Sequence, residues 1–197
     1  MAVEARSARG RPVVTSHGEI ERVAFRLFAV RGFTGTTLED IAREAGIGRR
    51  TIFRYYGSKN DIPWGQFDQT LGTFRELLDQ MPADLPVHEA VHRAVVAFND
   101  FPEDAMAAHR ERMRLILGTP ELQAHSALRY AEWRAVVAEF VAERSGCAPT
   151  DLAPRVAAQV SLALALAAYD VWLADDSRVL TEVVSASLGE LERYLRS

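Results

Sequence analysis

The spacing of the apolar residues is the feature that most constrains the fold of this 197-residue chain. From residue 20 onwards, apolar side chains recur three and four positions apart, the period of an α-helix with one buried face. No stretch shows the alternation of apolar and polar residues that a half-buried strand requires. Proline, glycine and capping residues cut the pattern into segments. The sequence therefore predicts an all-α fold of nine helices.

Capping residues define where the predicted helices begin, and glycine or proline marks where most of them end. The first helix opens at Ser16, whose capping box with Glu19 precedes an apolar stripe that runs to Gly32. The nine predicted helices are residues 16–31, 36–45, 49–56, 58–80, 87–101, 103–117, 120–145, 151–174 and 177–195.

Charge is distributed unevenly along the chain. Residues 1–60 carry 11 Arg and Lys against 6 Asp and Glu, a net of +5, whereas residues 61–197 have a net of −9. A basic N-terminal part on an acidic body indicates that only the N-terminal part meets a polyanion, with chance fluctuation as the alternative. The acidic body argues against a protein that packages DNA nonspecifically, because DNA would repel most of its surface.

The sequence predicts a cytoplasmic protein that does not contact a membrane. The N-terminus lacks the apolar stretch of a secretory signal, and the single Cys147 excludes an internal disulfide. Residues 156–174 are almost continuously apolar, but Gln159 and Asp170 are among the residues that interrupt them. A helix buried at a subunit interface explains this segment better than a membrane-spanning helix does.

Residues 36–56 have the pattern of a helix-turn-helix unit. Gly46 supplies the positive φ of a tight turn, and Ile47 packs this turn into the core. We expect Ile52 and Phe53 to hold the following helix against the core, so that its arginines face outward. The second helix of such a unit places its side chains in the major groove of DNA.

The residue types of this unit suit DNA. Arginine can donate to O6 and N7 of one guanine, while threonine and tyrosine hydroxyls can bind phosphate. For each arginine taken alone, a solvated surface role is the better interpretation, so the prediction depends on the whole pattern. The predicted DNA-binding residues are Thr36, Thr37, Gly48, Arg49, Arg50, Thr51, Arg54, Tyr55, Tyr56 and Lys59.

The same stretch resembles the TetR family of bacterial regulators. The matching positions are residues 28–33, Thr36-Thr37, Ile41-Ala42, Ala45-Gly46-Ile47, Thr51 to Tyr56 and Ser58-Lys59. The resemblance implies a homodimer with its two recognition helices in successive major grooves, and a repressor that a ligand releases. Gly48 departs from the family, which commonly has serine at this helix cap.

Further segments are similar to the regulators associated with mycofactocin, a peptide-derived redox cofactor of actinobacteria. These segments are residues 60–65, 112–116, 123–126 and 130–134. This similarity implies control of mycofactocin-linked genes.

The resemblance also implies how the chain is divided. Residues 1–15 are expected to form a flexible basic arm, residues 16–62 the DNA-binding domain with its recognition helix at about 48–56, and residues 63–197 a ligand-binding and dimerisation domain. Family members dimerise through their last two long helices, although an intramolecular core is the alternative for these stripes. The predicted interface residues are Leu162, Leu166, Val183, Leu188 and Leu191.

A small-molecule effector is expected among the helices of the body. Its predicted contacts, for which core packing is the alternative, are Phe98, Arg112, Met113, His125, Arg129, Tyr130, Trp133 and Tyr169. This mixture of aromatic and cationic groups suits an amphipath with an acidic or phosphorylated head, such as an acyl-coenzyme A thioester.

An enzyme and a transcription activator are the alternative functions. An enzyme needs a converging nucleophile and base or a metal set, and His88 and His92 have no third ligand at suitable spacing. We therefore predict no catalytic residues, no metal and no cofactor. A transcription activator of the same fold stays open, because activation or repression depends on where the operator lies.

Overall fold

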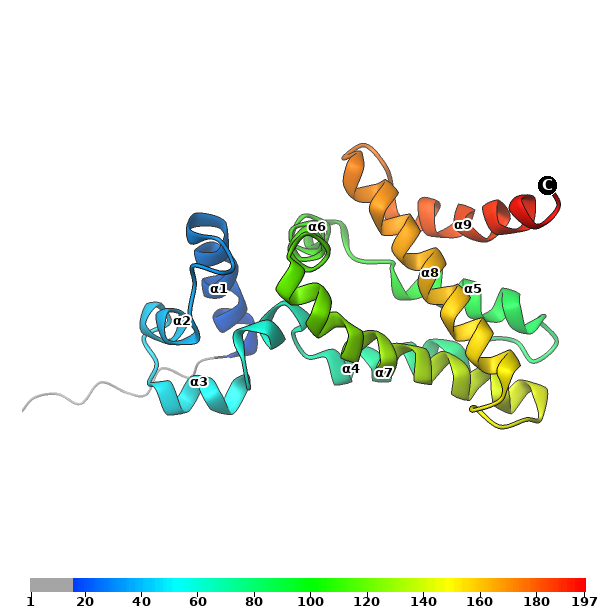
Figure 1. Ribbon diagram of the computed structural model, residues 1–197, viewed down its shortest axis with the longest axis horizontal. Helices are drawn as coiled ribbons and strands as arrows, with labels where there is room; N and C mark the ends of the chain where they lie inside the picture. Colours follow the sequence, from blue (N-terminus) through cyan, green and yellow to red (C-terminus); the bar gives the residue numbers. More distant parts are fainter. Residues whose placement is uncertain (1–15) are drawn as a thin grey trace, which may run out of the picture. The chain divides into compact units, whose positions relative to one another are not determined.

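The computed structural model describes residues 16–197, which form nine α-helices, one 3-10 helix and no strand (Figure 1). The all-α prediction is confirmed for these residues, and the predicted arm at residues 1–15 lies outside them. In chain order the helices are α1 (His17–Arg31), α2 (Leu38–Glu44), α3 (Arg49–Tyr55), the 3-10 helix η1 (Lys59–Trp64), α4 (Phe67–Asp79), α5 (Val87–Phe98), α6 (Glu103–Gly118), α7 (Pro120–Ser145), α8 (Leu152–Ala174) and α9 (Leu180–Leu195).

The chain divides into two compact units, of which the first ends at Gly65 and the second comprises Gln66–Ser197. This boundary lies three residues beyond the predicted one at residue 62. The first unit holds α1 to α3 and η1, and the second holds α4 to α9.

The first unit is a three-helix core closed by caps and one turn. Ile20, Ile41 and Ile52, one from each α-helix, are fully buried. Capping boxes at Ser16 and Thr37 satisfy the first N–H groups of α1 and α2. Between α2 and α3 the backbone turns at Gly46, whose φ of 66° falls in the left-handed region that glycine tolerates.

The predicted helix at residues 58–80 is interrupted, which is a correction. Its first part is the 3-10 helix η1, and α4 begins only at Phe67. Gly65 separates the two with a φ of 58°, a value that a right-handed helix cannot contain. The interruption coincides with the boundary between the two units.

The core of the second unit is built around α8, which packs against both α7 and α9 (Figure 1). Trp172 of α8 and Leu180 of α9 are almost completely buried. Between α4 and α7, the ring of Phe74 stacks on Trp133 with centroids 5.0 Å apart. Aromatic contacts of this kind stabilise a core beyond the area that they bury.

Among the described residues, α8 alone has the length and composition of a membrane-spanning helix, with a mean hydropathy of 1.6 over its most apolar window. A third of that window is buried within the unit. Gln159 and Asp170 are exposed on the same helix. Placing such groups in hydrocarbon is costly, so the exposed face of α8 suits a protein interface better.

Candidate functional site

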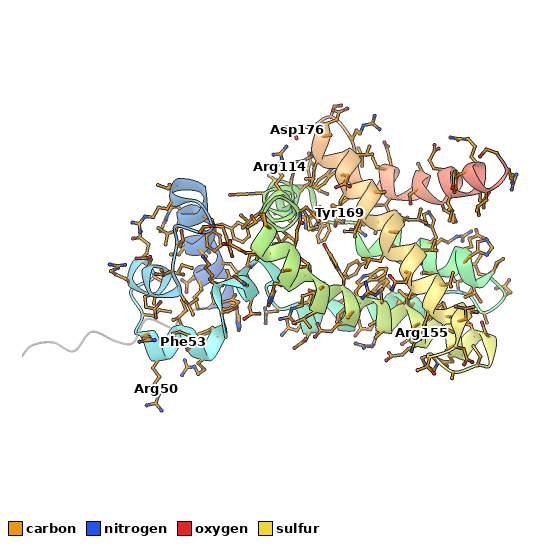
Figure 2. All side chains as sticks on the ribbon, in the orientation of Figure 1. Arg50, Phe53, Arg114, Arg155, Tyr169 and Asp176 are labelled. Carbon is orange, nitrogen blue, oxygen red and sulfur yellow. The ribbon has the colours of Figure 1, made fainter. Side chains whose placement is uncertain are left out.

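Helix α3 presents a cationic face. Arg49, Arg50 and Arg54 are exposed, whereas Ile52 is fully buried against the rest of the unit. Figure 2 shows Arg50 extending away from the helix. Successive residues of a helix lie about 100° apart, so Arg50 and Arg54, each two positions from the buried Ile52, lie about 160° from it and point outward. A convex helix with this charge fits the major groove, as the sequence predicts.

Two of these arginines are held by neighbouring groups. The Nε atom of Arg49 pairs with the Glu39 carboxylate at 3.2 Å, and its guanidinium lies 5.5 Å from the ring centroid of Phe53. Arg54 lies over the ring of Tyr55 at 5.6 Å. Contacts of this kind already restrict the arginine side chains, so less conformational entropy is lost when they bind DNA.

Phe53 lies at the surface, which corrects the expectation that it would anchor α3. Its exposed fraction is 43%, whereas Tyr56 is only 3% exposed and completes the buried face with Ile52. Helical register distinguishes the two aromatic residues in the sequence. Tyr56 follows Ile52 by four residues and shares its face of the helix, whereas Phe53 is adjacent to Ile52 and does not.

The predicted phosphate contact of Tyr56 is therefore wrong. Its ring is buried, and its hydroxyl donates to the Glu21 carboxylate of α1 at 3.1 Å. Tyr55 is half-buried, with its ring edge-on to His17 at 4.8 Å. These aromatic contacts fix the C-terminal end of α3 to the start of α1.

The two adjacent threonines have different positions. Thr36 is fully buried and its hydroxyl donates to the Gly32 carbonyl at 2.9 Å, so its predicted contact with DNA is wrong. Thr37 is exposed and accepts a hydrogen bond from the Asp40 backbone N–H. Hydrogen bonds from Thr37 hold the pKa of Asp40 below its usual value, aided by the nearby guanidinium of Arg43. Thr37 stays a candidate for DNA contact at the N-terminus of α2.

Lys59 is half-buried, and its ammonium bonds within the first unit. Its ammonium donates to the carbonyls of Phe33 at 2.8 Å and Thr36 at 3.0 Å, and it lies 4.5 Å from the Phe33 ring centroid. These bonds tie η1 to the loop between α1 and α2. Two of the three N–H donors of this ammonium are therefore used by carbonyls of the protein itself.

Gly48 is the N-cap of α3 and provides no side-chain hydrogen bond. Its φ of −73° and ψ of 154° suit any residue, and a Cβ atom at this position would meet no atom within 4 Å. Nothing in the fold therefore requires glycine here. Thr51, the remaining predicted contact, is half-buried in the first turn of α3.

Three of the eight predicted effector contacts are packed into the core of the second unit. Met113, Trp133 and Tyr169 are each at most 9% exposed. The other five are half-buried, namely Phe98, Arg112, His125, Arg129 and Tyr130.

A polar cluster surrounds Tyr169. Its hydroxyl lies 2.5 Å from Asn99 Oδ1 and 2.8 Å from His109 Nε2. Because the amide oxygen can only accept, the hydroxyl donates to Asn99 and the imidazole N–H donates to the hydroxyl. Burial, together with the charge of Arg112, lowers the pKa of His109 to about 4. Burial also raises the pKa of Tyr169, with a smaller contribution from Tyr130, so the cluster is neutral near pH 7.

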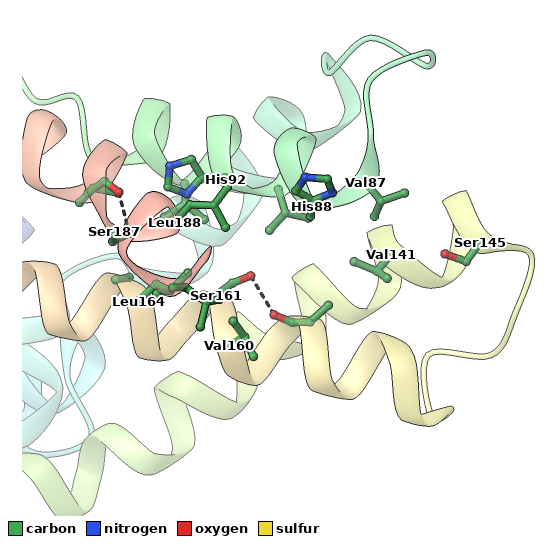
Figure 3. A pocket seen from close by; sticks show the side chains of 16 residues that line it. Val87, His88, His92, Val141, Ser145, Val160, Ser161, Leu164, Ser187 and Leu188 are labelled. Carbon is green, nitrogen blue, oxygen red and sulfur yellow. Dashed lines mark hydrogen bonds between the residues drawn. The ribbon is translucent and has the colours of Figure 1, made fainter. Parts of the chain in front are cut away.

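The structure contains a pocket of about 390 Å³ elsewhere, between α5, α7, α8 and α9 (Figure 3). None of the eight predicted effector contacts lines it. Ala157, Ser161 and Ala165 contribute small side chains at four-residue spacing on α8, which leaves room between the helices. Most other lining residues are aliphatic, and the Ser161 and Ser187 hydroxyls donate to carbonyls of their own helices. His88 and His92 add two imidazoles on the α5 side, and the rest of the wall suits an apolar ligand.

The predicted dimer residues are buried or half-buried within the protomer. Leu162 is 8% exposed, and both Leu188 and Leu191 line the pocket. Leu166 and Val183 are half-buried.

A different face of α8 and α9 is open to solvent. We call it the α8–α9 face, and define it by the exposed apolar and small residues Val156, Ala163, Ala167 and Val171 on α8, and Ser185, Ala186 and Gly189 on α9. Gln159 and Asp170 on α8 and Glu182 and Glu190 on α9 are also exposed. Within residues 16–197, no three His, Cys, Asp or Glu side chains are grouped closely enough to hold a metal ion.

Family models match both units. Residues 20–62 match the bacterial regulatory proteins of the tetR family, and residues 85–196 match the MftR C-terminal domain. The chain is 49% identical over 187 residues to MftR of Mycobacterium tuberculosis, a regulator assigned to mycofactocin biosynthesis, covering 95% of this chain and 93% of that one. It is 27% identical to the regulator EthR of Mycolicibacterium smegmatis, covering 83% and 79% of the two chains.

Solved structures share the fold at low identity. The Thermus thermophilus repressor FadR, solved with lauroyl-CoA, superposes with a TM-score of 0.57 at 22% identity, covering 88% of this chain and 91% of that one. NalD of Pseudomonas aeruginosa, a repressor of a multidrug efflux pump, gives a TM-score of 0.60 at 19% identity and covers 90% and 93%.

Proposed function

Because the chain belongs to the TetR family of bacterial regulators and has an MftR C-terminal domain, we propose that it represses its target genes until an effector releases it from DNA. The observation that carries this proposal is the exposed cationic face of α3, which is formed by Arg49, Arg50 and Arg54. Activation by the same fold is the second candidate, and the position of the operator distinguishes the two.

The regulator acts in the cytoplasm, on genes linked to mycofactocin. Its 49% identity to MftR of M. tuberculosis over nearly the whole of both chains supports this assignment. Double-stranded operator DNA is its macromolecular partner.

It acts as a homodimer through the α8–α9 face. This face combines exposed valines on α8 with small residues on both helices, so that two copies can approach closely. The two recognition helices of a dimer then address half-sites one DNA turn apart, about 34–36 Å.

The effector is an acyl-CoA-like amphipath whose hydrocarbon chain enters the pocket between α5, α7, α8 and α9. The apolar wall and the volume of about 390 Å³ support this choice. A change in the second unit reaches the first through the chain after Gly65, where α4 begins. A coupling free energy of about 1–3 kcal/mol changes operator affinity about 5–150-fold.

DNA binding is tested by titrating the purified protein against DNA from upstream of its own gene and from upstream of mycofactocin genes. Fluorescence anisotropy with unrelated competitor DNA measures the affinity. We expect tight binding that resists the competitor, with two protomers per operator. Binding that unrelated DNA abolishes equally well on every fragment would contradict a sequence-specific regulator of these genes.

Effector binding is tested by calorimetry with lauroyl-CoA and shorter acyl-CoAs. We expect heat of binding and release of the operator, both of which Ala157→Trp abolishes by filling the pocket. Ala153→Trp is the matched control, because Ala153 is exposed on the same helix outside the pocket. Equal binding by both variants would mean that the effector binds outside this pocket. Titrations that give no heat of binding would exclude acyl-CoA as the effector.

A further inference from the structure

Phe53 exposes a large apolar ring on the helix that carries the DNA-reading arginines (Figure 2). Its side chain is 43% exposed on α3, a helix of seven residues. Single exposed apolar residues are common on protein surfaces, so its position matters more than its exposure. The inference drawn from it rests on the proposed function as a DNA-binding regulator.

The core does not need this ring. Ile52 and Tyr56 fill the buried side of α3, with exposed fractions of 0% and 3%. Phe53 follows Arg49 by four residues and Arg50 by three, so helical geometry places the three side chains on neighbouring rows. Phe53 therefore belongs to the side of α3 that carries arginines.

Arg49 lies next to the Phe53 ring. Its guanidinium lies 5.5 Å from the ring centroid, and its Nε atom is held by Glu39 at 3.2 Å. The pair thus forms a small surface in which an arginine fork and an apolar ring lie side by side.

The chemistry of the major groove identifies the partner of such a ring. A phenyl group has no donor or acceptor, so it cannot bind phosphate or read the hydrogen-bonding pattern of the bases. The apolar group that the major groove offers is the C5-methyl of thymine. We propose that Phe53 contacts a thymine methyl group in each half-site of the operator, beside the base pair that Arg49 or Arg50 reads.

The experiment starts from operators that the wild-type protein selects from a random duplex library. Each thymine of a selected operator is then replaced by deoxyuridine, which lacks only the methyl group. At one position per half-site we expect the wild-type Kd to rise about fourfold, the effect of exposing one buried methyl group. Replacement in both half-sites should raise it about fifteenfold, since the two contacts are independent.

The Phe53→Ala variant should bind thymine and deoxyuridine at that position with equal affinity. Phe53→Leu, which keeps an apolar side chain, should retain part of the difference. Arg50→Ala is the control, because it should weaken binding while the thymine-to-uracil ratio stays at its wild-type value. Circular dichroism verifies that all three variants fold, as the exposure of both residues predicts.

Two results would overturn the proposal while leaving the regulator in place. The first is a wild-type protein that tolerates deoxyuridine at every thymine. The second is a Phe53→Ala variant that keeps the full penalty at the sensitive position. If the library yields no preferred sequence, the proposed sequence-specific function fails as well.

Discussion

At the scale of the residue, Thr36 and Lys59 are polar side chains beside the DNA-binding helices that serve the fold. The Thr36 hydroxyl donates to the Gly32 carbonyl, which closes the end of α1. The Lys59 ammonium donates to two carbonyls of the loop between α1 and α2. Buried carbonyls need donors, so these residues are constrained by the unit itself.

Thr36→Val tests this division of roles. The substitution keeps the shape of the side chain but removes the buried donor, so the free energy of unfolding should fall by about 1 kcal/mol. Operator affinity of the folded protein should stay within twofold of wild type. Urea denaturation and anisotropy measure the two quantities, and Thr37→Val at the exposed neighbour is the comparison. A large loss of affinity with unchanged stability would return Thr36 to the DNA contacts.

His109 makes the stability of the second unit depend on pH. Its pKa is lowered to about 4 in the folded state by burial and by Arg112, so the unfolded chain takes up a proton at higher pH than the folded one does. Stability is therefore lost as the pH falls from about 6.5 towards 4, by an amount on the order of 3 kcal/mol. Urea denaturation across this range measures the loss.

His109→Gln is the matched variant, because glutamine keeps an N–H near the position of Nε2 and does not titrate. Its stability should fall less steeply between pH 6.5 and 4 than that of the wild type. Identical slopes for the two proteins would show that His109 does not titrate differently in the folded chain.

At the scale of the element, caps and clamps decide where helices end and how they pack. Helix α7 has the predicted bounds, because Pro120 stands at its first position and Gly146 adopts a left-handed φ of 65° after its end. Helix α9 begins at Leu180, three residues after the prediction, because the Ser177 side chain bonds to Asp175 in a turn. Ser177 therefore belongs to the turn before α9 and does not start the helix.

Arg110 of α6 clamps the connection between α8 and α9. Its guanidinium lies 3.8 Å from the Trp172 ring and donates to the Trp172 carbonyl at 2.6 Å and to Asp176 at 3.0 Å. Arg110→Ala should lower the free energy of unfolding by about 2–3 kcal/mol, since it removes a mostly buried charged donor and its stacking.

Arg114→Ala is the control for this clamp, because the half-exposed Arg114 side chain donates to Asp176, which is itself exposed. Its cost should stay below about 1 kcal/mol. Thermal and urea unfolding compare the two variants, and equal losses would mean that the clamp adds nothing beyond a surface ion pair.

At the scale of the whole molecule, the exposed α8–α9 face predicts the oligomeric state. Ala163 is exposed in the protomer, so Ala163→Arg should leave the fold intact while placing an unpaired charge in the interface. We expect sedimentation velocity to show monomers at micromolar concentration, and operator affinity to fall at least tenfold. Ala124→Arg, on an exposed position of α7, should stay dimeric. A dimeric Ala163→Arg variant would place the interface elsewhere.

The sequence by itself determined the helices, the tight turn at Gly46 and the arginine-rich α3, because these depend on neighbours within a few positions. It could not decide which residues of a helix face the core. Phe53 and Tyr56 are both aromatic, and the rotation of α3 about its axis, set by contacts with α1 and α2, exposes one and buries the other.

The proposed effector pocket and the proposed dimer face likewise depend on tertiary packing. Leu188 and the small residues of α8 acquire their roles from how α5, α8 and α9 approach one another. Apolar periodicity shows that a helix has a buried side, but a stripe of apolar residues can face a core, a pocket or an interface. Only packing between residues far apart in the chain distinguishes the three, because burial depends on which surface lies opposite.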